Sequence, residues 1–380
     1  MAVSALAKKL AAEGRDIIDL SAGEPDFDTP AWISDAAIAG IRAGKTRYTQ
    51  PQGIPELRAA VARDLLSNAA PGWKFSGENV VVGAGAKQAL FNVCFALFGP
   101  GDEVLVAAPY WTSYPDIVAL ARAEPAFVTG SEERDYKLTV EDLEKVRTPR
   151  TRGLIVSSPS NPSGAVYSLE ELRAVAGWAR GHGVWLLSDE IYRRIYFGSE
   201  GGAAPGLLSL SPEELGPFVI LDGVSKTFAM TGWRIGYMLG DAGLAGKVGA
   251  LQSQTTSNPA TPSQVAALAA LSNPEKAAAS IAEMVAAFRR RRDLVVNRVK
   301  EKLPHLSFVY PDGAFYLFLK VSAEYGEKMK GSQAWCASVL EGTGVAMVPG
   351  SAFGDDRYAR MSFATSDDIL EESVRRLAAR

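Results

Sequence analysis

The stretch FVILDGVSKTFAMTGWR, residues 218–234, decides the fold class of this chain. Its first seven residues form a short apolar run of the kind found in strands that are buried on both faces of a sheet. Ser225 and then Lys226 follow this run, with Arg234 a short way on. A lysine at the end of a buried strand is poorly solvated, which favours its neutral, nucleophilic form. The alternative is an ordinary lysine whose stem packs on the protein while its amine reaches water.

The same pattern repeats on both sides of this stretch. Apolar runs at 79–83, 102–109, 153–159 and 184–190 alternate with segments of helical periodicity. The helix predicted over 168–182 begins with a capping box, Ser168 with Glu171, and Gly183 follows its end. Strands that alternate with helices predict an α/β fold with a mostly parallel sheet sandwiched between helices.

The chain is long enough for two domains. A long helix is predicted from about residue 274, and strand-like runs and a further helical segment follow it. We therefore expect a large domain over 35–280 and a smaller α+β domain built from 1–34 plus 281–380. The arginine run at 289–292 lies on the long helix, where its side chains point in different directions. We expect a solvated face with local ion pairs there, in preference to a nucleic-acid patch.

Composition narrows the class of protein. The 380 residues carry 40 Lys and Arg against 43 Asp and Glu, a formal charge of −3, which gives no reason to expect nucleic-acid or membrane binding. No apolar run is long enough for a membrane span, and the first residues lack the pattern of a signal peptide. Cys94 and Cys336 are expected as buried thiols, and the two histidines are too isolated for a zinc site, so no metal is expected. A cytoplasmic enzyme is the default expectation.

Other strand ends carry candidate ligand-binding residues, because ligands of open parallel sheets gather at the carboxyl ends of the strands. These candidates are the turn of Ala84, Gly85 and Ala86, then Trp111, Asn161 and Asp189. Each has a plainer explanation: a tight turn, aromatic packing, turn chemistry or a structural ion pair. Taken together they supply an anion cradle, an aromatic plate, an amide and a poorly solvated carboxylate beside a lysine. That set suits pyridoxal phosphate, which needs a lysine for its aldehyde, an acid for its ring nitrogen and a phosphate site.

Nine stretches, in this order along nearly the whole chain, resemble the class I/II pyridoxal-phosphate-dependent aminotransferases of fold type I. The closest resemblance is to the bacterial aspartate/prephenate aminotransferase branch. The stretches are LSAGEPDFDTP (20–30), RYTQPQGIPELR (47–58), GAGAKQALFN (83–92), PYWTSYPD (109–116), SSPSNPSGAVYS (157–168), LSDEIY (187–192), SKTFAMTGWRIGY (225–237), PDGAFYLF (311–318) and RMSFATS (360–366).

The resemblance implies a role for each matching residue in the catalytic centre. Lys226 would form the Schiff base with the cofactor and then move the proton from the substrate Cα to the cofactor. Asp189 would hold the ring nitrogen protonated, and Tyr192 would hydrogen-bond the ring oxygen. Trp111 would stack on the ring, and Asn161 would contact the ring oxygen and the substrate. The reaction would be a ping-pong transamination.

The resemblance also implies how the two ends of the site are held. Ser225, Arg234 and the backbone of Ala84, Gly85 and Ala86 would bind the phosphate. Tyr48 would reach the phosphate in the neighbouring subunit, which implies a homodimer with shared active sites.

At the substrate end, the resemblance assigns the α-carboxylate to Arg360 and a backbone contact to Gly23, beside Trp111 and Asn161. Lys87 would bind a distal carboxylate, which implies aspartate as amino donor and 2-oxoglutarate as acceptor. Two alternatives stay open: a lyase with the same cofactor and fold, and a transaminase for aromatic or other amino acids. A transcription regulator with a domain of this kind would need an added DNA-binding segment, and the first matching stretch already begins at residue 20.

Overall fold

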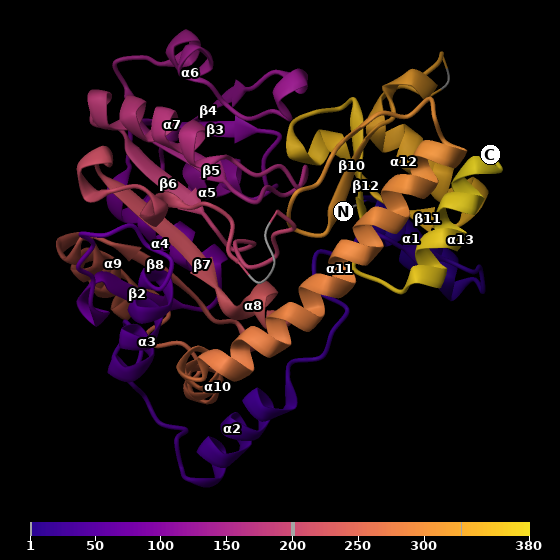
Figure 1. Ribbon diagram of the computed structural model, residues 1–380. Coiled ribbons are helices and arrows are strands. Elements are labelled where there is room, and N and C mark those ends of the chain that lie inside the picture. The colour runs from indigo at the N-terminus through magenta and orange to yellow at the C-terminus, as the bar shows by residue number, and fades with distance from the viewer. Residues whose placement is uncertain (1, 199–201, 328) are drawn as a thin grey trace.

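The chain folds into two parts, one around a wide sheet and one around a smaller group of strands, and one long helix runs between them (Figure 1). The computed structural model describes residues 2–198, 202–327 and 329–380. Met1, which belongs to the predicted segment 1–34, lies outside the described residues.

The wide sheet has seven strands in the order β2-β8-β7-β6-β5-β3-β4. All neighbouring pairs are parallel except the two that involve β8, which is antiparallel to both β2 and β7. The prediction of a mostly parallel sheet is therefore confirmed. The strands are β2 (Val80–Gly83), β3 (Glu103–Ala108), β4 (Glu124–Thr129), β5 (Thr151–Ser157), β6 (Trp185–Asp189), β7 (Phe218–Gly223) and β8 (Gly236–Gly240).

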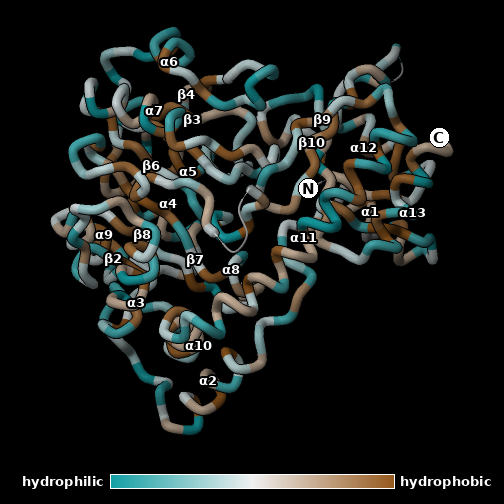
Figure 2. The backbone as a smooth tube through the Cα atoms, in the orientation of Figure 1, coloured by the Kyte–Doolittle hydropathy of each residue, from teal (hydrophilic) through white to brown (hydrophobic). Residues whose placement is uncertain are grey.

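Both faces of this sheet are buried, which explains the continuous apolar runs. Along β7, Val219 and Leu221 join one hydrophobic cluster and Ile220 joins another, because successive side chains of a strand point to opposite faces. Figure 2 shows hydrophobic stretches along these strands and hydrophilic stretches in the outer loops. The helices of this part are α2 (Ala31–Arg42), α3 (Pro55–Leu66), α4 (Ala86–Leu97), α5 (Tyr114–Leu120), α6 (Val140–Val146), α7 (Leu169–His182), α8 (Val224–Thr227), α9 (Ala242–Thr255) and α10 (Thr261–Ser272).

The ends of α7 follow the sequence prediction. The Ser168 hydroxyl accepts a hydrogen bond from the Glu171 amide, and the Glu171 carboxylate accepts one from the Ser168 amide. Gly183 ends the helix in the left-handed conformation, with φ of 64°. The capping box and the glycine stop are both confirmed.

The smaller part contains two short sheets. One is the parallel pair of β1 and β11, and the other is an antiparallel sheet in the order β12-β13-β10-β9. Its strands are β1 (Ile18–Asp19), β9 (Phe308–Val309), β10 (Tyr316–Lys320), β11 (Val345–Ala346), β12 (Val348–Pro349) and β13 (Tyr358–Ser362). Its helices are α1 (Ala2–Ala12), α12 (Gly331–Thr343) and α13 (Asp367–Ala378). N-terminal and C-terminal segments therefore meet in one unit, as Figure 1 shows for α1 and α13.

Helix α11 (Pro274–Lys302) connects the two parts. Its first turns, including Ala277, pack against the core of the wide sheet, whereas Phe288 and Val295 belong to the core of the smaller part. We keep a domain boundary near residue 280 as a proposal.

The arginine run at 289–292 corrects one expectation. Arg291 and Arg292 are buried, not solvated. Arg291 pairs with Asp26 at 2.8 Å and lies against Phe27, while the Arg292 guanidinium lies 4.8 Å from the Phe197 ring centroid. A local ion pair is present between Arg292 and Asp293 at 2.7 Å, but the Arg291 pair joins α11 to a segment far away in the sequence. Burial follows because these two guanidinium groups have carboxylate and aromatic partners within reach.

The remaining expectations concern cysteines and membrane helices. Cys94 and Cys336 are buried and unpaired, as predicted. Within the described ranges, no helix combines the length and the apolar character needed to cross a membrane.

Candidate active site

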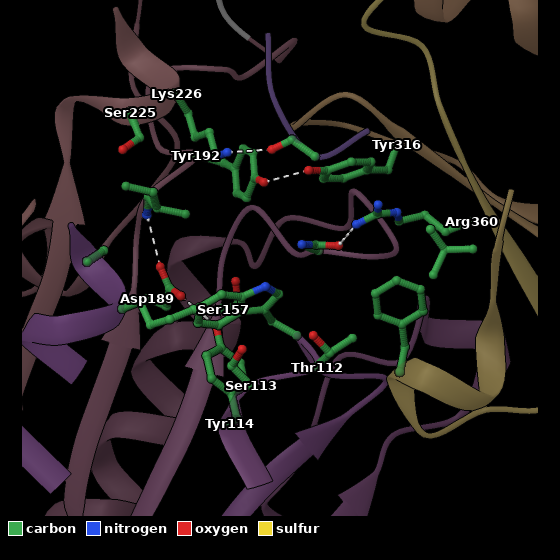
Figure 3. A pocket seen from close by; sticks show the side chains of 18 of the residues that line it. Thr112, Ser113, Tyr114, Ser157, Asp189, Tyr192, Ser225, Lys226, Tyr316 and Arg360 are labelled. Carbon is green, nitrogen blue, oxygen red and sulfur yellow. Dashed lines mark hydrogen bonds between the residues drawn. The ribbon is translucent and has the colours of Figure 1, made fainter. Parts of the chain in front are cut away.

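A cavity of 730 Å³ lies where the carboxyl ends of the large sheet face the smaller part (Figure 3). Most of the residues predicted from the sequence line it together, although they are far apart in the chain. They are Gly23, Ala86, Lys87, Trp111, Asn161, Asp189, Tyr192, Ser225, Lys226, Arg234 and Arg360. The convergence follows from the fold, because parallel strands deliver their following loops to one edge.

Lys226 projects into this cavity from α8, the short helix that follows β7. Its amine donates a hydrogen bond to the Gly23 carbonyl oxygen. Burial lowers the pKa of this amine to about 8, while the nearby Glu24 carboxylate acts in the opposite direction. The poorly solvated lysine expected from the sequence is therefore present.

Asp189 ends β6 and is 7% exposed. The Tyr114 hydroxyl donates to its Oδ2 at 2.6 Å, and the Ile191 amide donates to its Oδ1 at 3.2 Å. Burial raises the pKa of this carboxyl to about 6. Two donors thus partly replace the water that the carboxylate has lost, and a cation in the cavity would complete its surroundings.

Arg360 lies on β13 and reaches the cavity from the smaller part. Its Nη1 donates to Asn161 Oδ1 at 2.9 Å and its Nη2 donates to the Ser21 carbonyl oxygen at 2.8 Å. Its Nε is buried and has no hydrogen-bond partner among the described residues. A buried guanidinium without a carboxylate partner is prepared to receive an anion.

The turn between β2 and α4 lies against Arg234. Gly85 has φ of 88°, and a Cβ built on it would lie 2.5 Å from Arg234 Nη2, so this position requires glycine. Arg234 donates through Nη1 to the Thr231 carbonyl oxygen and through Nη2 to the Ala84 carbonyl oxygen. These contacts hold a second guanidinium at the cavity wall.

Not every amide of this turn is free for an anion. The Ala84 amide donates to Gln88 Oε1, and the Gly85 amide donates to the Gly83 carbonyl oxygen. Ala84 and Gly85 are absent from the cavity lining, whereas Ala86 and Lys87, the first residues of α4, are part of it. An anion would therefore meet the start of α4, where amides lack partners within the helix.

Tyr48 lies outside the cavity of its own chain and is 92% exposed. Two buried tyrosines that line the cavity, Tyr114 and Tyr316, were not predicted from the sequence. For Tyr316 the available signal was a hydroxyl group within the apolar stretch AFYLFL (314–319), because a buried tyrosine hydroxyl needs a hydrogen-bond partner. The stretch TSYPD (112–116) around Tyr114 gives no such signal.

Comparison with known proteins agrees with this geometry. The family model described as aminotransferase class I and II matches residues 15–377. The chain belongs to this aminotransferase family. An aspartate/prephenate aminotransferase of Cereibacter sphaeroides is 43% identical, over 100% of this chain and 94% of that protein. An aspartate aminotransferase of Geobacillus stearothermophilus is 40% identical, over 99% of this chain and 94% of that protein.

Solved structures of aminotransferases share the fold. The aspartate aminotransferase of Thermus thermophilus with maleate superposes with a TM-score of 0.91 and 39% identity, covering 100% of this chain and 95% of that one. The Rhizobium meliloti enzyme has a TM-score of 0.88 and 40% identity, over 99% of this chain and 94% of that one. The resemblance inferred from the motifs is confirmed, and the chain is an aminotransferase; the comparisons do not favour the lyase alternative.

Proposed function

We propose that this aminotransferase uses pyridoxal phosphate to move the amino group of aspartate to 2-oxoglutarate by a ping-pong mechanism. The observation that carries the proposal is one cavity in which Lys226, with its lowered pKa, faces the buried groups Asp189 and Arg360. The free buried thiols also favour a reducing compartment, so we include a cytoplasmic location in the proposal.

The cavity fits this cofactor at each chemical group. Lys226 would bind the aldehyde carbon, Asp189 would pair with the protonated ring nitrogen, and Trp111 would cover the ring. Tyr192 and Asn161 would hydrogen-bond the ring oxygen. The phosphate would be held by the residues around the start of α4 and α8, namely Ala86, Ser225 and Arg234. When bound, the cofactor supplies an electron sink that stabilises negative charge on the substrate Cα.

The protein would supply proton transfer and orientation. The Lys226 amine, once neutral, is the base that would take the proton from the substrate Cα, and its lowered pKa makes the neutral form accessible near neutral pH. Asp189 lies on the large-sheet side of the cavity, opposite Arg360, and would keep the ring nitrogen charged. Arg360 would hold the α-carboxylate, since its Nε has no partner of its own among the described residues.

The proposed substrate pair rests on Lys87. Its amine lies 4.9 Å from the Trp111 ring centroid at the cavity wall, where it would meet a distal carboxylate. The names of the relatives support aspartate, and maleate in the Thermus thermophilus structure is a dicarboxylate. Apolar residues, Val348, Ala352 and Phe353, also line the cavity and favour an aromatic substrate as the second candidate.

Lys87→Ala tests the specificity. We expect kcat/KM for aspartate to fall about 100-fold, the loss of a charged contact, while kcat/KM for alanine changes less than about threefold. Lys247→Ala, on α9 and outside the cavity lining, is the control. Equal losses for aspartate and alanine would remove Lys87 from the specificity proposal.

An absorbance spectrum of the purified chain tests the function as a whole. We expect a cofactor band that is lost in Lys226→Ala and bleached by aspartate alone, then restored by 2-oxoglutarate. A chain with a cofactor band that no amino acid changes would contradict the proposal.

We also propose a homodimer with shared sites. The support is the exposed ring of Tyr48, which cannot serve the cavity of its own chain, beside further exposed apolar side chains such as Ile38 and Ile41 on α2. A large exposed aromatic of this kind is typical of a contact surface.

A further inference from the structure

The buried tyrosine Tyr316 is the strongest unassigned feature of the cavity. It is the first residue of β10, it is 0% exposed, and it lines the cavity between Tyr192 and Arg360. It makes one contact through its hydroxyl and a different one through its ring (Figure 3).

The hydroxyl contact is with Tyr192. The two hydroxyl oxygens are 2.7 Å apart, and the rings meet edge to face at 79°. Within the described ranges of the chain, neither hydroxyl has another hydrogen-bond partner. Each hydroxyl has a single proton to donate, so only one of the two can donate across this contact.

Both tyrosines are buried, so the direction of that hydrogen bond follows from which proton would find a second acceptor, and the ring oxygen of the proposed cofactor would supply one to Tyr192. If Tyr192 donated to Tyr316, the proton of the fully buried Tyr316 would have no acceptor, which is costly. If Tyr316 donates, its proton is satisfied, and the Tyr192 proton is free for an acceptor in the cavity. Burial also raises the pKa of Tyr316 above its usual value, so its hydroxyl keeps its proton at neutral pH.

Besides neighbouring aromatic rings, the Tyr316 ring contacts Arg360. The guanidinium carbon of Arg360 lies 4.2 Å from the Tyr316 ring centroid and 5.0 Å from the Phe353 ring centroid. Tyr316 and Arg360 are diagonal neighbours, because Phe318 is the residue paired with Arg360 across β10 and β13. The aromatic face attracts the cation and limits its orientation.

We propose that Tyr316 is a positioning residue with two separable functions: its hydroxyl directs the Tyr192 proton toward the cofactor ring oxygen, and its ring holds the Arg360 guanidinium for the substrate carboxylate. The inference rests on the proposed cofactor and adds a residue that connects its ring with the substrate end. A hydrogen bond received by Tyr192 strengthens the one that it donates, since linked hydrogen bonds polarise one another.

The hydroxyl function is tested with the full-length, cofactor-loaded chain and the variant Tyr316→Phe. The readout is the pH midpoint at which the cofactor absorbance changes. A hydrogen bond donated to the ring oxygen favours the deprotonated form of the bound cofactor. We therefore expect the protonation equilibrium of the bound cofactor to change about fivefold, which moves the midpoint upward by about 0.7 pH units. We expect kcat to fall about fivefold and KM for aspartate to stay unchanged.

Two comparisons decide whether Tyr316 acts through Tyr192. In a Tyr192→Phe background, Tyr316→Phe should cause no further shift of the midpoint. Tyr167→Phe is the matched control, because it removes a buried hydroxyl that accepts from the Leu138 amide outside the cavity, and it should leave the midpoint unchanged. An unchanged midpoint in Tyr316→Phe, or an equal shift in the Tyr192→Phe background, would overturn the hydroxyl function.

Tyr316→Leu tests the ring function. We expect KM for aspartate to rise about fivefold above that of Tyr316→Phe, because the cation loses its aromatic face. Equal KM values in the two variants would overturn this half, and thermal unfolding of the cofactor-free forms would show whether each variant is folded. If Tyr316→Leu does not fold, Tyr316→Trp replaces it in this test. Tyr316→Trp keeps an aromatic face, so its KM for aspartate should equal that of Tyr316→Phe. A higher KM would overturn the ring function. A wild-type chain without any cofactor band would instead contradict the proposed function.

Discussion

At the scale of single residues, the environment of Lys226 determines when the site can react. An amine adds to an aldehyde only in its neutral form. The usual pKa of 10.5 leaves almost no neutral lysine near pH 7, whereas a pKa of about 8 leaves about one tenth of it neutral. The burial that makes the lysine costly to charge therefore also makes it reactive.

We predict that the rate at which the cofactor-free chain captures pyridoxal phosphate rises with pH, is half-maximal near pH 8 and levels off about one pH unit higher. The sign follows from the lowered pKa, because the neutral fraction grows as pH rises through that value. Stopped-flow absorbance would measure the rate, with N-acetyl-lysine methylamide as a reference amine. A half-maximal rate near pH 10 would mean that Lys226 is an ordinary solvated lysine.

The sequence allowed site residues to be predicted where a charged side chain stands at the end of an apolar run. Asp189 ends a buried strand and Lys226 comes shortly after another, so their placement at the carboxyl edge of the sheet could be predicted from the apolar runs alone. Tyr316 could not be predicted in the same way, because a tyrosine within an apolar stretch is compatible with simple packing, and Tyr114 lies in the mixed stretch TSYPD (112–116), which does not indicate burial. Their partners come from distant segments, and pairing of that kind appears only in the folded chain.

At the scale of elements, the turn from β2 to α4 depends on Gly85. We predict that Gly85→Ala weakens pyridoxal phosphate binding about tenfold, because the new methyl group would lie 2.5 Å from Arg234 Nη2 and displace that guanidinium. Pyridoxal, which lacks the phosphate, should bind equally to both forms. Equilibrium dialysis would measure the two affinities.

Gly14 is the control for the strain that alanine experiences at a positive φ, as distinct from displacement of the Arg234 guanidinium. Gly14 has φ of 84°, close to the 88° of Gly85, but a Cβ there would meet nothing within 4 Å. Gly14→Ala should therefore leave both affinities unchanged. A comparable loss of pyridoxal binding in Gly85→Ala would show that the turn had collapsed as a whole.

The strand that delivers Lys226 is anchored by a buried ion pair. Arg193 Nε lies 2.5 Å from Asp222 Oδ2 at the end of β7, and Arg193 also bonds Asp64 on α3. We predict that Arg193→Met lowers the free energy of unfolding by about 3–5 kcal/mol, because Asp222 would be left buried and unpaired. Denaturant unfolding of the cofactor-free chain would measure it.

The exposed pair of Arg173 and Glu214 provides the contrast. Arg173→Met should change the free energy of unfolding by less than about 1 kcal/mol, as expected for surface ion pairs. Similar losses in both variants would mean that the Arg193 pair contributes no more than a surface contact.

Elements with strong periodicity or end signals were predictable, and the others were not. The capping box and glycine stop of α7 lie within one short stretch, so local sequence determines them. Strands β4 and β8 were missed. The half-exposed sequence of β4, with Pro125 in it, reflects its place at the sheet edge, and β8 lies antiparallel in a sheet whose other pairs are parallel. Their identity as strands depends on neighbours that the local sequence does not show.

At the scale of the whole molecule, α11 shows why burial of charge is hard to predict. Four successive arginines spread around most of the helix circumference, and Arg291 and Arg292 fall three and four residues after the buried Phe288, on its face of the helix. The burial of Arg291 and Arg292 depends on Asp26 and Phe197, residues far away in the sequence that only the assembled fold brings to the helix. Composition and periodicity describe one element at a time, so they miss such contacts.

The proposed dimer predicts that two inactive variants restore activity to each other, which a site built from one chain alone does not allow. If Tyr48 completes the site of the other subunit, a chain with Lys226→Ala still offers an intact Tyr48 to its partner. A chain with Tyr48→Ala still offers an intact Lys226. In a mixed dimer, one site would then carry both defects and the other would have neither.

We predict that mixed dimers, purified through two different affinity tags, recover about half of the wild-type activity. Each parent variant alone should have at most about a tenth of it, since one removes the reactive amine and the other a phosphate contact. Activity of the mixed dimer no higher than the mean of its parents would show that each chain completes its own site, and Tyr48 would then have no role across the interface.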